Sequence, residues 1–234
     1  MTTSQNTTIN NEVFNRVYLL RRFISIVGID VNDIIDSYAG QVFNCGIPKQ
    51  KVVKEFLQGQ ISDETARTLG EACASEGLAS FRDIRNPVSY ACELVIGWLF
   101  EDAVYLLLEK ANYQPSMSGT DKDREFLADT QIASTSDFCV IADGVSRSLE
   151  VVSDYGNFWS RSNKCDLRHS KAGASEIILG IALQKPAYFV FDFTKPQSEV
   201  VLTESVWHEV WNKPVKRLEG IASIMKPLKN GLVL

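Results

Sequence analysis

Residues 87–112 place the strongest constraint on the fold, because they form the longest helical pattern in the chain. Apolar residues recur there on most sides of the helix that the spacing predicts. Pro87 suits the first turn, since the N–H that proline lacks would have no intrahelical partner at that position. A helix that is apolar on most sides must be buried, so we expect it to pack against a sheet.

Two acidic residues interrupt this apolar helix. Glu93 and Glu101 are each four residues from Gly97, so the three positions lie near one face of the helix, each rotated slightly from the one before. A carboxylate in apolar surroundings is costly unless it is ionised against a metal or another cation. The two glutamates are therefore candidate functional residues, and a position at the solvent edge of the helix would explain them equally well.

Residues 1–85 are expected to form a helical region. Gly28, Gly59 and Gly77 separate its helical patterns, and Ser62 is a candidate N-cap. A plain helical subdomain is the simplest interpretation of this region. The expected helices cover residues 12–27, 31–39, 49–58 and 62–76.

After a polar connection, the apolar period changes from that of helices to that of strands. Gly144 lies in the turn of an expected hairpin. The expected strands cover residues 138–141, 148–153, 177–183, 187–193 and 199–202. Helical spacing returns at 204–211 and 215–225, so residues 86–234 are expected to form an α/β core with C-terminal helices.

Composition excludes several classes of protein. No run of about 18 apolar residues is present, so no membrane-spanning helix is expected. The first residues lack a basic segment followed by an apolar one, so we expect a cytoplasmic protein. The five cysteines are scattered, which argues against a zinc site or a disulfide framework. Neither His169 nor His208 has a recognisable nucleophile nearby in the sequence, so catalysis would depend mainly on carboxylates and lysines.

Two carboxylates in the expected hairpin form the candidate centre. Asp137 precedes the first strand, and Glu150 interrupts the apolar second strand. Pairing of the two strands can bring both carboxylates to one edge of the sheet. Together with a backbone carbonyl they would make an oxygen site suited to Mg²⁺. A metal ion there would lower the pKa of a bound water and stabilise charge on a phosphoryl oxygen.

The order of these features resembles the PD-(D/E)XK nuclease superfamily, which has the restriction-endonuclease-like fold. The resemblance covers about residues 87–202. It implies an α/β, restriction-endonuclease-like core, in which a central mixed sheet is flanked by helices, together with the N-terminal helical subdomain. The resemblance rests on the long helix with an internal glutamate, on Ser136-Asp137 and on Glu150-Val151-Val152.

The resemblance also implies roles for individual residues. Asp137, Glu150 and the main-chain carbonyl of Val151 would bind Mg²⁺, for which Mn²⁺ can substitute. Glu101 matches the glutamate that many members carry on the preceding helix, and matches it better than Glu93 does.

The sequence departs from the family pattern at Val152, which occupies the position of the family's lysine. Either another lysine takes over its role, or the domain does not cut. Lys164 and Lys171 are the candidates, and Lys171 is preferred because a short helix beginning near Arg168 could point it at the strand edge. A lysine there would orient the attacking water and the phosphate.

The sequence therefore predicts a Mg²⁺-dependent DNA endonuclease, similar to type II restriction or phage-type nucleases. Arg161, Lys164 and Arg168 are the expected DNA contacts, because basic side chains interleaved with aromatic ones suit phosphates and base edges. The formal net charge of −5 argues against broad coating of nucleic acid but is compatible with a focused cleft. A homodimer is expected by analogy, since one small chain cuts one strand at a time.

Two alternatives stay open. The domain could be a catalytically silent nuclease-like module that binds DNA or protein, an interpretation that Val152 favours. It could also be a different α/β protein, in which Glu150 forms a salt bridge with Arg147 or Arg161.

Overall fold

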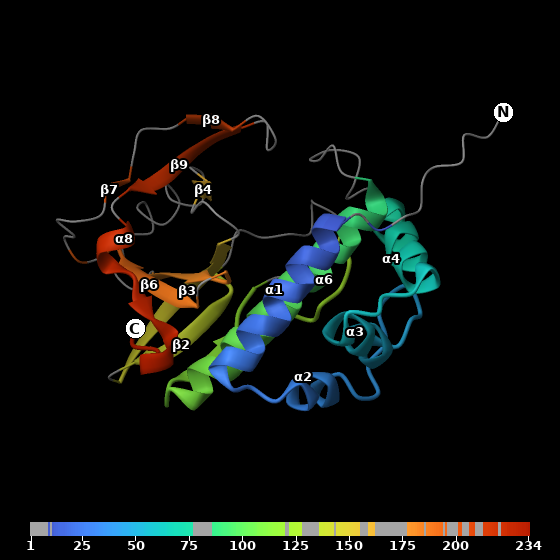
Figure 1. Cartoon of the computed structure of the whole chain (residues 1–234), viewed down its shortest axis with the longest axis horizontal. Helices are drawn as coiled ribbons and strands as arrows, with labels where there is room; N and C mark the ends of the chain where they lie inside the picture. The colour runs from blue at the N-terminus through green and yellow to red at the C-terminus, as the bar shows by residue number, and fades with distance from the viewer. Residues whose placement is uncertain are drawn as a thin grey trace.

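Five helices and a six-stranded mixed sheet dominate the part of the chain that the computed structural model describes (Figure 1). Among these residues, no helix combines the length and apolar character that crossing a membrane requires. The structure describes residues 9, 11–76, 86–119, 122–127, 136–142, 144–154, 159–161, 177–184, 186–193, 195, 201–202, 206–208, 213–219 and 221–234.

The residues before the long helix form four helices at the positions that the apolar spacing predicted. Ser62 caps the fourth, because its hydroxyl accepts a hydrogen bond from the N–H of Thr65 at 3.2 Å. Gly59 ends the third with a φ of +71°, a left-handed conformation that glycine adopts without a steric penalty. The helices are α1 (Asn11–Val27), α2 (Val31–Ser37), α3 (Lys49–Gln58) and α4 (Asp63–Ser75).

The long buried helix is α6 (Pro87–Lys110), and Asn86 caps it by accepting the N–H of Ser89 at 2.8 Å. The sheet that follows has the strand order β1-β2-β3-β5-β6-β10. β3 and β5 run parallel, and the other neighbouring strands run antiparallel. The predicted α/β class with a mixed sheet flanked by helices is thus confirmed. The strands are β1 (Gln114–Met117), β2 (Phe138–Ala142), β3 (Val145–Asp154), β5 (Ile177–Ala182), β6 (Ala187–Asp192) and β10 (Lys226–Pro227).

One hydrophobic core joins the helices to the sheet. α1 and α4 pack on α6, and α1 lies along α6 in Figure 1. Phe23 of α1, Leu99 of α6 and Phe138 of β2 belong to the same buried cluster, which therefore spans both sides of residue 85. Because side chains alternate along a strand, a smaller cluster occupies the opposite face of the sheet. Its buried members are Ile178, Phe189 and Phe191.

The helices predicted over 204–211 and 215–225 are wrong. Among the described residues of these ranges, 206–208 and 215–219 are strands, and one short helix, α8 (Ile221–Ile224), falls within the second range. Apolar runs this short fit helical and strand spacing alike, so pairing with distant segments decides the outcome. These strands form a second sheet, made of β4 (Trp159–Arg161), β7 (Val201–Leu202), β8 (Val206–His208) and β9 (Lys213–Glu219), in which β9 pairs with the other three.

Gly180 of β5 is required by a close approach between strands. It pairs with Phe189 of β6, and a Cβ at Gly180 would lie 1.9 Å from the Phe189 ring. Gly180→Ala is therefore expected to lower the free energy of unfolding by about 1–3 kcal/mol, the usual cost of overpacking. Denaturant unfolding followed by circular dichroism measures this difference.

Gly97→Ala provides the matched control. Gly97 lies inside α6, and no neighbouring described atom comes within 4 Å of the position of its Cβ. Alanine should therefore raise the free energy of unfolding by up to about 1 kcal/mol through its helix propensity. Equal stability of Gly180→Ala and the wild type would contradict the packing of Phe189 over β5.

Candidate functional site

The β2–β3 hairpin brings Asp137 next to the backbone that carries Glu150. Phe138 pairs with Leu149, so Asp137, one residue earlier, lies opposite Glu150 when the register is continued. Residues directly opposite on antiparallel strands have Cβ atoms about 5 Å apart. The Asp137 carboxylate also accepts a hydrogen bond from the N–H of Val151 through Oδ2, at 2.8 Å. The two acidic residues therefore meet at one end of the hairpin.

Glu150 is buried, with 7% of its surface exposed. Alternation along β3 places it on the same sheet face as Val152, which packs against the smaller hydrophobic cluster. A buried carboxylate needs a cation, a hydrogen-bond donor or a proton, and an acidic residue opposite it increases that need. Arg147, a partner considered for Glu150, forms its ion pair with Asp192 at 3.0 Å. The salt bridge between Glu150 and Arg147 is therefore not formed.

The groups at this end of the hairpin fit a hard divalent cation. Mg²⁺ is commonly bound by one or two protein carboxylates and keeps several water ligands. Within the described ranges, no three Asp, Glu, His or Cys side chains are grouped so that they could hold a metal ion. Asp137 and Glu150 therefore form a candidate pair of carboxylates and not a site of three side chains.

Glu101 belongs to a buried ionic network centred on Arg124. Nη1 of Arg124 lies 2.6 Å from Oε2 of Glu101, and Nη2 lies 2.8 Å from Oδ1 of Asp102. The hydroxyl of Tyr38 donates a hydrogen bond to Oδ2 of Asp102 at 2.5 Å. Arg124, Asp102 and Tyr38 are each less than one-tenth exposed. Their mutual ion pairs and hydrogen bonds offset the cost of removing these groups from water.

The network shifts the protonation equilibria of its members. Burial and the neighbouring Asp102 carboxylate raise the pKa of Tyr38 above its ordinary value of 10.0, so the phenol stays a hydrogen-bond donor. Burial acts to lower the pKa of Arg124, but Asp102 and Glu101 raise it further than burial lowers it. The guanidinium is therefore permanently charged.

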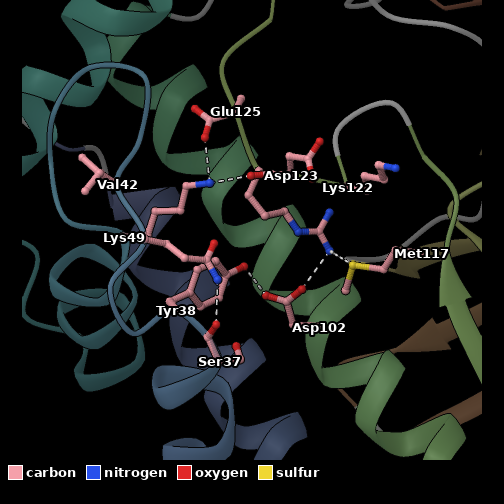
Figure 2. A pocket seen from close by; sticks show the side chains of 11 residues that line it. Ser37, Tyr38, Val42, Lys49, Asp102, Met117, Lys122, Asp123 and Glu125 are labelled. Carbon is pink, nitrogen blue, oxygen red and sulfur yellow. Dashed lines mark hydrogen bonds and ion pairs between the residues drawn. The ribbon is translucent and has the colours of Figure 1, made fainter.

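A pocket of about 520 Å³ opens beside the network (Figure 2). Lys49, which is 3% exposed, donates a hydrogen bond to the main-chain carbonyl of Asp123 and pairs with the Glu125 carboxylate at 2.8 Å. Figure 2 shows the Lys49 ammonium between Glu125 and Asp123, with Tyr38 directed toward Asp102. The pocket has no formal net charge, because three basic and three acidic side chains line it. It therefore offers no net attraction for a polyanion such as DNA.

The remaining predicted site residues are placed in part or not at all. Lys164, Arg168 and Lys171 lie outside the described residues, as does the helix expected near Arg168. Arg161 ends β4 in the second sheet, where its backbone alone is described. Glu93, the other glutamate of α6, pairs with Arg16 of α1 at 3.1 Å. Glu93 thus joins two helices.

Sequence reasoning missed four residues of the ionic network. Asp102 directly follows Glu101 in the apolar helix, so it carries the same signal of a costly charge. The sequence gives no such signal at Tyr38, Lys49 or Arg124. These residues lie at the ends of short helices or in a connection, where polar residues are usual.

No protein-family model, curated protein or solved structure matches the chain. The function must therefore be inferred from the chemistry and geometry of the residues themselves.

Tyr38→Phe is expected to lower the free energy of unfolding by about 1–3 kcal/mol near neutral pH, because a buried oxygen of Asp102 loses its donor. Since folding raises the pKa of this phenol, its contribution to stability is complete below pH 10.0 and is lost as the pH rises above that value. The variant should therefore lose less stability than the wild type between about pH 9 and about pH 11. Denaturant unfolding across this range measures the effect, and parallel curves for the two proteins would contradict it.

Proposed function

We propose that this chain is a Mg²⁺-dependent DNA endonuclease that hydrolyses phosphodiester bonds. The observation that carries the proposal is the position of Asp137 opposite Glu150, with its carboxylate bound to the N–H of Val151. A mixed sheet with the buried helix α6 on one face supports a restriction-endonuclease-like core.

In this proposal Asp137, Glu150 and the carbonyl of Val151 bind the metal ion. When bound, the ion lowers the pKa of a water molecule and stabilises negative charge on a phosphoryl oxygen. The N–H of Val151 orients the Asp137 carboxylate in advance, at 2.8 Å. Burial of Glu150 restricts the rotamers that its side chain can adopt. Both effects reduce the entropy lost when ligand and phosphate bind.

The attacking water needs a second positive group, because Val152 stands where the superfamily has lysine. We assign this role to Lys171, which would orient the water and polarise the phosphate. Arg161, Lys164 and Arg168 supply contacts to the DNA backbone, which position the duplex without specifying its sequence. A homodimer would place one centre on each strand.

A catalytically silent nuclease-like module is the second candidate, and one observation favours it. Val152 packs into the hydrophobic cluster on the face of the sheet that also carries Glu150. This environment suits packing better than a lysine-assisted reaction. Such a module would bind DNA or a protein with an affinity that EDTA does not change, and it would nick no plasmid with any divalent ion.

Cleavage of supercoiled plasmid in Mg²⁺ or Mn²⁺ tests the proposal. Asp137→Asn and Glu150→Gln should each lower the rate by at least about 100-fold, because the ion loses a charged ligand. Asp192→Asn is the matched control, since Asp192 is a buried acid of the same sheet held by Arg147. It should lower stability and still cut. Wild-type rates in either Asp137→Asn or Glu150→Gln would rule out the assigned centre.

The assignment of the lysine has a separate test. Lys171→Met should lower the cleavage rate by about 10²–10⁴-fold, the usual contribution of a group that assists proton transfer. Lys164→Met removes a nearby lysine of the same segment and should mainly weaken DNA binding, with a smaller dependence of affinity on salt. If Lys171→Met cut at the wild-type rate and Lys164→Met lost most of its cleavage rate, Lys164 would have the role assigned to Lys171.

A further inference from the structure

The pocket beside the Arg124 network has walls that the fold itself holds in place. Lys49 of α3 binds the carbonyl of Asp123 and pairs with the carboxylate of Glu125 at 2.8 Å. Arg124, between these two residues, pairs with Asp102 of α6 at 2.8 Å. The connection between β1 and β2 is therefore fixed to both helices. A pocket whose lining is already ordered loses little conformational entropy when a ligand binds.

An aromatic cluster supports the same wall. The ring of Phe126 packs against those of Phe43 and Trp98, with ring centroids 5.7 Å and 5.3 Å away. Asn44 donates its N–H to the Glu125 carboxylate at 2.7 Å and its side-chain amide to the carbonyl of Phe126 at 2.9 Å. The loop after α2 and the connection between β1 and β2 therefore form one continuous wall.

Most of the charges in the lining are neutralised within the lining itself. Lys49 and Arg124 are each paired with a carboxylate that also borders the pocket. Lys122 and Asp123 remain, and both are exposed. Neither of their side chains forms an ion pair or a hydrogen bond within the described part of the chain. The pocket thus presents one free ammonium group and one free carboxylate.

The two free charges come from consecutive residues, whose Cα atoms lie about 3.8 Å apart across a trans peptide bond. Figure 2 shows Lys122 and Asp123 on the same side of the pocket. An α-amino acid carries its own ammonium and carboxylate groups on one carbon atom, so both can bind this pair at the same time. A ligand with a single charge would satisfy only one of the two residues.

The uncharged part of the lining indicates which side chain such a ligand carries. Val42 is 51% exposed and borders the pocket, so an aliphatic group bound there would cover apolar surface that now faces water. Tyr38, the aromatic residue of the lining, is only 5% exposed and offers no open face on which a nucleobase could stack. The volume of about 520 Å³ is that of a small-molecule site.

We propose that this pocket binds a free α-amino acid with an aliphatic side chain. The carboxylate of Asp123 accepts from the ligand's ammonium group, the Lys122 ammonium donates to the ligand's carboxylate, and Val42 packs against its side chain. α6, which supplies Asp102 to the pocket, packs on the sheet face opposite the one that carries Glu150. The site is therefore separate from the candidate metal centre, and the inference does not depend on the proposed function.

Isothermal titration calorimetry of the full chain with L-leucine tests the proposal. Isocaproate has the same carbon chain without the ammonium group, and isoamylamine has it without the carboxylate. Each should bind at least about 10-fold more weakly than L-leucine, as expected when a hydrogen bond to a charged group is lost. The absence of saturable binding by L-leucine, or equal binding by either analogue, would overturn the proposal.

Variants of the two free charges locate the site. Asp123→Asn and Lys122→Gln should each weaken L-leucine binding at least about 10-fold and leave the thermal midpoint near its wild-type value, because both side chains are exposed. Lys229→Gln is the matched control, since Lys229 is an exposed lysine outside the lining. It should bind L-leucine as the wild type does. An equal loss in Lys229→Gln would show an effect of net charge alone and contradict the assigned site.

Val42→Ser tests the aliphatic part of the ligand. It should weaken the binding of L-leucine by about 4-fold or more, the effect of one buried methylene group. The binding of glycine, which has no side chain, should be the same in this variant and in the wild type. Unchanged affinity for L-leucine in Val42→Ser would show that the pocket does not select an aliphatic side chain, and the proposed ligand class would be wrong.

Discussion

Burial of α6 is the constraint on which the rest of the structure depends. A helix that is apolar on most sides cannot face water, and here α1 and α4 cover part of it while the sheet covers another part. The helices before residue 85 and the strands after it therefore share one core. This arrangement fixes the position of each α6 residue relative to the strands, and it places the ring of Tyr105 on that of Phe138 at the start of β2.

The same constraint explains where the charged groups lie. Residues 122–127 of the connection between β1 and β2 carry charged groups that pair with the helices: Arg124 binds Glu101 and Asp102 of α6, and Glu125 binds Lys49 of α3. Lys49 and Arg124 thus anchor residues 123–125 to α3 and α6. The start of β2 is held beside the end of β1, because the N–H of Ser118 donates a hydrogen bond to the carbonyl of Asp137 at 3.0 Å.

Sequence patterns gave the helices, the hairpin and the two following strands, because each is set by local spacing and capping. They failed over 204–219, where Val215 and its neighbours satisfy helical and strand spacing and β4 supplies the deciding partner. They also singled out Asp137 and Glu150 as candidate residues, because a charged residue beside or inside an apolar run can be recognised in the sequence. The sequence could not identify Arg124, because its contacts with Glu101 of α6 and Met117 of β1 form only when the chain folds.

The acidic residues named above differ in what lies next to them, and this difference separates the ion pairs between elements from the candidate pair on the hairpin. Glu93, Asp102 and Asp192 each meet an arginine from another element, which satisfies the charge within the protein. On the hairpin, the Asp137 carboxylate accepts a hydrogen bond from the N–H of Val151, and the continued register places Asp137 opposite Glu150. Two carboxylates placed opposite each other repel, and a bound cation is the neutralising group that the proposed function assigns to them. In that proposal a divalent ion would bind both carboxylates, and it would supply the positive charge that stabilises a phosphoryl oxygen during hydrolysis.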